Sequence, residues 1–118
     1  MSDTVFLYLT TRGRVTGLPR RIEIWFVEHA GCFYLVAEMR ERAQWVQNIR
    51  AHDRVDFSVG TRDEPTASIE QRPARARVLE PTREPDLAAR VSALMEAKYD
   101  WSEGTIVEID PRAVTEHA

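Results

Sequence analysis

Alternation of apolar and polar positions predicts that most of this chain forms β-strands. In residues 20–28, Ile22 and Ile24 face one way while Arg21 and Glu23 face the other, as in a strand with one buried face. Residues 5–11 are β-branched and aromatic on both faces, which is typical of an inner strand. The same reasoning gives further strands at residues 33–37, 54–59, 67–71, 74–79 and 105–109.

Two segments change to the period of a helix. In residues 40–51 and 84–99, apolar residues recur every three or four positions, which predicts two amphipathic helices. We expect Thr82 to cap the second helix and Pro85 to lie in its first turn. Most connections between strands are too short for parallel crossovers, so the sheet must be mainly antiparallel, and closing it into a barrel removes its edges. The predicted fold is therefore mainly β: a barrel of six or seven mostly antiparallel strands with two flanking helices.

Size and composition fit one globular domain spanning residues 1–118. The chain has 43% hydrophobic and 30% charged residues and a net charge of −3, which argues against a nucleic-acid partner. No apolar run approaches the roughly 20 residues of a membrane span, so no integral membrane association is expected. Cys32 lies alone in an apolar run and is predicted to be a buried thiol, which favours a cytoplasmic location.

The first candidate binding site is residues 10–20, which connect two predicted strands. It carries threonine hydroxyls, two glycines and arginines, and no acidic residue lies near enough in sequence to neutralise them. Such a loop can cradle an anion through backbone N–H groups and guanidinium groups. The alternative is an ordinary hairpin loop whose arginines are solvated.

A second candidate is the passage from the strand 33–37 into the helix 40–51. A helix N-terminus offers free N–H groups and a positive dipole, and Arg40 and Arg42 add charge there. Alternatively, these arginines pair with Glu38 and Glu41. Trp45 lies one helical turn before Ile49 and is either a core residue or a stacking partner for a ligand.

Other chemistry finds little support in the sequence. There is no G-x-G-x-x-G motif and no P-loop, so a doubly wound nucleotide domain is not expected. The three histidines lack metal-ligand spacing, and no metal site is predicted. No serine or cysteine has an evident base partner for nucleophilic catalysis.

The two candidate stretches carry a resemblance to a known family. The run Thr11-Arg12-Gly13-Arg14-Val15-Thr16-Gly17-Leu18-Pro19-Arg20 resembles the signature T-x-G-R-K-T-G-x-P-R of deazaflavin-dependent nitroreductases and quinone reductases. Tyr34-Leu35-Val36-Ala37, followed by Trp45-x-x-Asn48-Ile49-x-Ala51, is similar to the family's second segment, Y-L-V-A…W-x-x-N-L-x-A. The match covers roughly residues 7 to 60 and extends more loosely over the remainder.

The resemblance implies a split β-barrel, usually a homodimer, that binds the deazaflavin coenzyme F-420. Hydride then passes to a small-molecule electron acceptor such as a quinone, nitro or enone compound. By analogy, ten residues form the site: Arg14, Thr16 and Gly17 at the phosphate side; Glu23 and Trp25 beneath the ring; Arg40, Arg42 and Trp45 at the loop that closes over the phosphate chain; and Tyr99 and Trp101 beside the substrate.

Two departures from the family pattern bear on the cofactor. Val15 stands where the signature has a lysine, and the loop between Ala37 and Trp45 is shorter and lacks the family's glycine pair and proline. Arg40 and Arg42 are candidates to compensate. Two alternatives stay open: an FMN-binding oxidoreductase on the same barrel, and a flavin-binding carrier or sensor without turnover.

Overall fold

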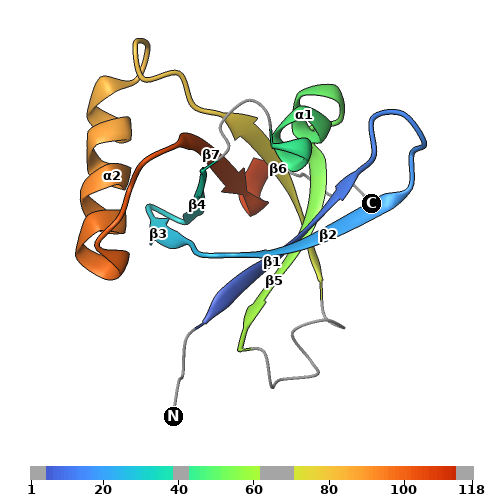
Figure 1. Ribbon diagram of the computed structural model, residues 1–118, viewed down its shortest axis with the longest axis horizontal. Coiled ribbons are helices and arrows are strands. Elements are labelled where there is room, and N and C mark those ends of the chain that lie inside the picture. Colours follow the sequence, from blue (N-terminus) through green and yellow to red (C-terminus); the bar gives the residue numbers. More distant parts are fainter. Residues whose placement is uncertain (1–4, 39–42, 62–70, 114–118) are drawn as a thin grey trace.

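The computed structural model describes residues 5–38, 43–61 and 71–113. Within them lie seven strands, two α-helices and a short 3-10 helix (Figure 1), in this order: β1 (Phe6–Arg12), β2 (Pro19–Ile24), β3 (Val27–His29), β4 (Cys32–Ala37), α1 (Gln44–Ala51), β5 (Arg54–Gly60), β6 (Arg72–Val78), α2 (Pro85–Tyr99), β7 (Thr105–Asp110) and the 3-10 helix (Pro111–Ala113).

All seven strands form one antiparallel sheet in the order β2-β1-β5-β6-β7-β4-β3. The strands β2 and β3 are its two opposite edges, yet only Trp25 and Phe26 separate them in the chain. The sheet must therefore curl until its edges approach each other, which gives the half-barrel of Figure 1. The predicted mainly antiparallel barrel with two helices is confirmed.

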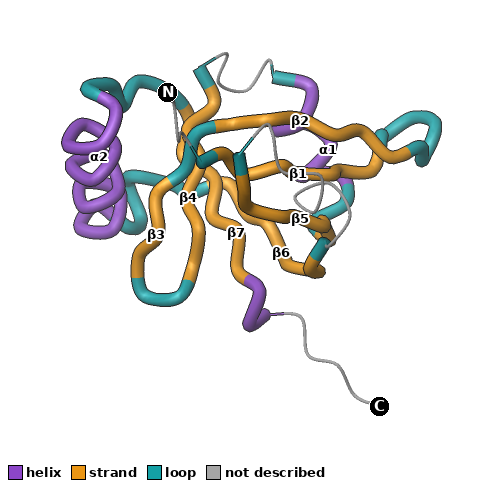
Figure 2. Tube along the Cα trace, turned by 90° about the horizontal axis from the view of Figure 1, so that it is seen from below, coloured by secondary structure: helices purple, strands orange, loops and turns teal. Residues whose placement is uncertain are grey.

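The barrel has one core inside and a second core outside, beneath α2. All six residues of β4 are buried, because alternate side chains enter different cores. Leu35 packs inside the barrel with Phe57 and Ile109, while Tyr34 packs with residues of α2 such as Met95. The helix α2 lies beside β3 and β4 in both views (Figures 1 and 2).

The hairpin between β3 and β4 turns within two residues. Its two turn residues, Ala30 and Gly31, have φ values of 53° and 85°, and His29 pairs with Cys32 across it. Positive φ at both central positions is typical of the turns that match the twist of a hairpin. Cys32 itself is buried, as expected.

The observed elements differ from the predicted ones in three places. The strand expected at residues 20–28 is interrupted at Trp25 and Phe26, because there the chain leaves one sheet edge for the other. Thr82 lies in a turn, and α2 begins instead at Pro85 with Glu84 as its N-cap residue and no side-chain cap. The strand expected at residues 67–71 falls outside the described residues, except for Gln71, which is not in a strand.

The helix predicted near residues 40–51 is present from Gln44 to Ala51, and residues 39–42 lie outside the described part of the chain. Neither helix in the described ranges has the length and apolar character needed to cross a bilayer.

Candidate functional site

The junction between β2 and β3 carries a cluster of aromatic rings. Trp25 stacks on Tyr99, with 4.4 Å between ring centroids and an interplanar angle of 1°. Trp101 meets Trp25 edge-on at 6.3 Å. Parallel and edge-to-face pairs at these separations are favourable for aromatic rings, so the end of α2 fixes the plane of Trp25.

The same helix end satisfies the backbone of the junction. The Tyr99 hydroxyl donates to the Phe26 carbonyl oxygen at 2.9 Å and accepts from the Phe26 N–H at 3.2 Å. The Lys98 ammonium group donates to that carbonyl at 3.0 Å and lies 4.3 Å from the centroid of the Phe26 ring. A buried backbone group must find a partner, and Phe26 lies between strands, where the sheet supplies none.

Beside this cluster is a cavity of about 630 Å³, which we call the aromatic cavity. Its walls come from the junction, the end of β4, the start of α1 and the end of α2, and its lining residues are Phe6, Glu23, Ile24, Trp25, Val36, Ala37, Glu38, Ala43, Trp45, Tyr99 and Trp101. This volume is in the usual range for a small-molecule site. The Glu23 carboxylate accepts a hydrogen bond of 2.9 Å from the Tyr8 hydroxyl.

The arginine-rich connection between β1 and β2 is an ordered loop. The Gly13 N–H donates to the Leu18 carbonyl oxygen, and the Gly17 N–H donates to that of Gly13. Gly17 has a φ of 77°, a conformation that glycine adopts without a steric cost. Within the described residues, the N–H groups of Val15 and Thr16 at the tip have no hydrogen-bond partner.

The helix α1 holds this loop through Asn48. The Asn48 amide oxygen accepts from the Arg14 N–H at 3.2 Å and from the Arg14 guanidinium at 3.1 Å. The Asn48 amide NH2 group donates to the Thr11 hydroxyl at 3.2 Å. Arg14 also donates to Gln44 at 2.8 Å. Because these partners are neutral, Arg14 is positioned while its charge stays uncompensated.

A second cavity of about 460 Å³ opens between this loop and α1, and we call it the basic cavity. Its lining residues are Gly13, Arg14, Val15, Thr16, Arg20, Arg21, Ile22, Gln44, Trp45 and Asn48. Trp45 lies in the walls of both cavities, so the two are neighbours across one indole ring. Trp45 also packs partly on the barrel core, so the ring is a core residue on one side and a cavity wall on the other.

The structure brings most of the predicted site residues together in these two places. Five of them line the aromatic cavity: Glu23, Trp25, Trp45, Tyr99 and Trp101. Arg14 and Thr16 line the basic cavity, and Gly17 belongs to the loop but not to the cavity wall. Arg40 and Arg42 lie outside the described residues. Asn48 is a site residue that was not among the predicted ones, although the W-x-x-N spacing of the second family segment contains it.

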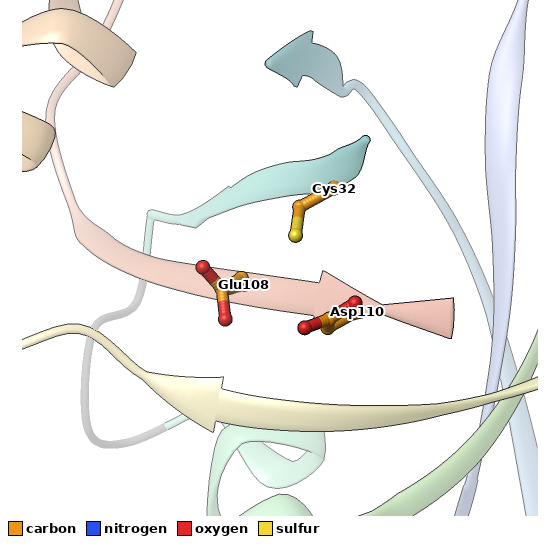
Figure 3. A group of neighbouring side chains, drawn as sticks. All are labelled: Cys32, Glu108 and Asp110. Carbon is orange, nitrogen blue, oxygen red and sulfur yellow. The ribbon is translucent and has the colours of Figure 1, made fainter. Parts of the chain in front are cut away.

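A separate cluster of Cys32, Glu108 and Asp110 joins β4 to β7, with the three side chains lying close together (Figure 3). Glu108 accepts hydrogen bonds of 2.8 Å from both the Tyr34 hydroxyl and the Arg77 guanidinium. Arg112 donates to Asp110 and to the Cys32 sulfur. Burial is the main cause that raises the pKa values of Cys32 and of Tyr34. These contacts support a structural role for the cluster.

Arg77 on β6 is held by two carboxylates. It donates to Glu108 and, at 2.6 Å, to Glu84 at the start of α2. These hydrogen bonds raise the pKa of the guanidinium further above its ordinary value. The other strand arginine, Arg75, is about half exposed and pairs with Asp53 at 2.9 Å. Both arginines lie on the exposed face of β6, where the alternation of residues 74–79 predicts them. Among the described residues, Arg77 differs in having two carboxylate partners instead of one.

The curled antiparallel barrel and its aromatic and basic cavities define a split-barrel protein of the pyridoxamine oxidase-like fold. The family model described as F-420H(2)-dependent quinone reductase matches residues 1–100. The chain therefore belongs to this family of oxidoreductases, whose cofactor is the deazaflavin coenzyme F-420. The resemblance seen in the sequence is confirmed.

Solved structures with the same fold include both deazaflavin-dependent and other proteins. An F-420H2-dependent reductase (FDR-A) is 23% identical over 89% of this chain and 93% of its own, with a TM-score of 0.58. The heme storage protein HutZ from Vibrio cholerae is 16% identical over 96% and 82%, with a TM-score of 0.69. A putative pyridoxamine 5'-phosphate oxidase from Listeria innocua is 16% identical over 90% and 82%, with a TM-score of 0.65. No curated protein matches the chain.

Proposed function

We propose that this protein uses reduced coenzyme F-420 to transfer hydride to a quinone, nitro or enone-type acceptor. The observation that carries the proposal is the pair of adjoining cavities, one walled by aromatic rings and one by arginines, that share Trp45. A deazaflavin has a flat, largely apolar ring system at one end and a phosphate group further along, so its two parts match the two cavities in chemistry.

The donors in the basic cavity fit a phosphate. Arg14, Arg20 and Arg21 line it, and guanidinium groups make short, charge-assisted contacts with phosphate oxygens. The N–H groups of Val15 and Thr16 add donors without charge. Val15 supplies no ammonium group in place of the family lysine, so on this proposal Arg14 and Thr16 hold the phosphate. Gly17 contributes by shaping the loop that carries them.

The aromatic cavity fits a flat ring. Trp25, whose plane Tyr99 fixes, and Trp45 offer apolar faces, and Glu23 offers a carboxylate that can accept a hydrogen bond from a ring N–H. When bound, reduced F-420 supplies the hydride. The residues of this chain bind and orient the two reactants and keep water from the aromatic cavity, with Tyr99 and Trp101 on the substrate side. No general acid from the protein is required if the acceptor takes its proton from water.

Titration of the purified chain with oxidised F-420, reduced F-420 and FMN tests the cofactor. We expect saturable binding of F-420, followed by the absorbance and fluorescence of the cofactor, and weaker binding of FMN. Tighter binding of FMN would support the alternative of an FMN oxidoreductase.

Turnover tests the acceptor. We expect oxidation of reduced F-420 to require a quinone, nitro or enone compound and to saturate with the acceptor concentration. Tight binding of F-420 without oxidation by any of these three classes would favour the alternative of a carrier or sensor.

We further propose a homodimer whose interface lies near the aromatic cavity. Trp25 is 39% exposed in the isolated chain, and a large exposed aromatic ring is typical of residues that an interface covers. One protein of similar fold, 24% identical with a TM-score of 0.58, is described as a domain-swapped dimer.

A further inference from the structure

The hairpin of β1 and β2 ends in two exposed apolar side chains. Val15 is 88% exposed and Leu18 is 59% exposed, more than the other large hydrophobic residues in the described ranges. The hairpin projects beyond the rest of the barrel in both views (Figures 1 and 2). Its backbone hydrogen bonds from Gly13 to Leu18 and from Gly17 to Gly13 hold the tip in shape, so presenting the two side chains requires little further ordering.

The same hairpin concentrates positive charge. Arg12, Arg14, Arg20 and Arg21 are all exposed, and residues 12–22 contain no acid. Among the described residues none of the four pairs with a carboxylate: Arg12 donates to the Gly17 carbonyl oxygen, and Arg14 donates to two amides. The protein as a whole has a net charge of −3, so its charge is strongly asymmetric, with the hairpin as the positive end.

An apolar tip surrounded by arginines matches the surface of an anionic bilayer. Apolar side chains enter the boundary between headgroups and acyl chains, while basic residues gain from the negative surface potential. A nucleic acid would leave Val15 and Leu18 without an apolar partner. A symmetric contact with a second copy would bring two positive hairpins together, which electrostatic repulsion opposes.

We propose that the hairpin tip docks this protein on anionic phospholipid membranes, with Val15 and Leu18 among the headgroups and the arginines against lipid phosphates. The docking is peripheral. It would bring the basic cavity, which shares Val15 and Arg20 with the hairpin, to the membrane surface, with the acceptor-binding aromatic cavity adjoining it across Trp45. This consequence, unlike the docking itself, rests on the proposed function.

Co-sedimentation of the full chain, without cofactor, tests the docking. We expect binding to vesicles of phosphatidylcholine mixed with phosphatidylglycerol, and little binding to phosphatidylcholine alone. Binding should weaken as salt rises, because exposed charges are screened. It should persist in millimolar inorganic phosphate, since a free anion does not replace the apolar contact. Equal binding to both vesicle types, or loss of binding in phosphate, would overturn the proposal.

Pairs of variants, one in the hairpin and one elsewhere, test whether the hairpin is the surface that binds the vesicles. Leu18→Asn should weaken partitioning to the mixed vesicles about tenfold, the effect of removing one buried aliphatic side chain. Val59→Asn, at an exposed valine on β5 away from the tip, should leave it unchanged. Arg20→Gln should weaken binding roughly fivefold, whereas Arg90→Gln, at an exposed position on α2, should not.

Equal effects in each pair would show that the hairpin is not the docking surface. A change in oligomeric state for Leu18→Asn without any change in vesicle binding would show instead that the tip is a protein interface. Titration of the same variants with F-420 in solution separates this proposal from the proposed function, because vesicle binding is measured without cofactor.

Discussion

At the scale of single residues, Arg14 connects the β1–β2 loop to α1 through neutral partners, so no carboxylate among the described residues neutralises its charge. Its guanidinium donates to the neutral side chains of Gln44 and Asn48, whereas Arg75 pairs directly with Asp53. The first arrangement leaves the charge free to attract an anion; the second neutralises it. Two exposed arginines of the same protein therefore differ in what they offer to a ligand.

We predict that Arg14→Ala weakens F-420 binding more than Arg75→Ala does. A lost charge-assisted contact is worth about 1.5–3 kcal/mol, which corresponds to a roughly tenfold to hundredfold rise in dissociation constant. Arg75→Ala removes only a solvent-exposed ion pair. Fluorescence titration of both variants measures the difference, and equal small effects would mean that the loop is only a hairpin.

Asn48 is the buried link between Thr11 and Arg14. We predict that Asn48→Ala lowers the free energy of unfolding by about 1–3 kcal/mol, because buried hydrogen-bonding groups lose their partner, and that it also weakens F-420 binding. Urea denaturation and titration measure the two effects. Gln44→Ala is the control: it removes an exposed contact to Arg14 and should change stability little. A variant of Asn48 with unaltered stability and affinity would exclude this linking role.

At the scale of elements, α2 packs on the outside of the barrel against β3 and β4 and is fixed at both of its ends. Its last turn binds the Phe26 backbone and stacks on Trp25, while its first turn is tied to β6 and β7 through Arg77. The helix is thus attached at its end to the junction between β2 and β3, and at its start to β6 and β7. Both attachments can be tested separately.

For the last turn, we predict that Tyr99→Phe keeps the ring stacked on Trp25 but removes the hydroxyl that holds the β2–β3 junction. Phe26 loses two hydrogen bonds to the hydroxyl, and Lys98 keeps one contact to its carbonyl. Stability should fall by about 1–2 kcal/mol, and tryptophan fluorescence should change because Trp25 is less restrained. Calorimetry and emission spectra measure these effects. Emission spectra and a melting temperature identical to those of the wild type would show that the Tyr99 hydroxyl does not hold the junction in place.

For the first turn, stability should depend on pH through Glu84. Hydrogen bonds from Arg77 lower the pKa of this carboxyl below its ordinary value of 4.5. The stabilisation is therefore present above pH 4.5 and is lost as the pH falls through the lower pKa of the folded state. Urea denaturation of wild type and Glu84→Gln should give the largest difference at neutral pH and a vanishing one in acid. Glu80→Gln, in the turn before α2, is the control, because it removes a carboxyl to which Arg77 does not donate.

At the scale of the whole molecule, the open side of the half-barrel is where the proposed dimer contact lies. Trp25 and Trp101 line the aromatic cavity there, and among the described residues the edge strands β2 and β3 do not pair with each other. We predict a dimer at micromolar concentration by light scattering, and a shift of Trp25 fluorescence on dilution. A stable monomer in the presence of F-420 would contradict the proposed dimer. It would mean that one chain alone forms the complete aromatic cavity.

The sequence by itself determined the elements and the family. Strand and helix periods are local properties, set by which face of each segment is apolar, so the antiparallel sheet and both helices could be predicted from them. The loop at residues 11–20 and the W-x-x-N spacing are local too, and they were sufficient to indicate a deazaflavin-dependent oxidoreductase. Where the local signal was ambiguous, as at the start of α2, the prediction was wrong: Thr82 does not cap it.

Only the tertiary structure decided how these parts combine. Phe26 and Tyr99 are 73 positions apart and meet because the sheet curls and the end of α2 lies against the junction between β2 and β3. The curling of the sheet has three further consequences. The strand is interrupted at Trp25, Trp45 separates two cavities, and Arg14 is attached to Asn48. Contacts between distant segments depend on the order and curvature of strands, and these are properties of the assembled sheet that no local pattern contains.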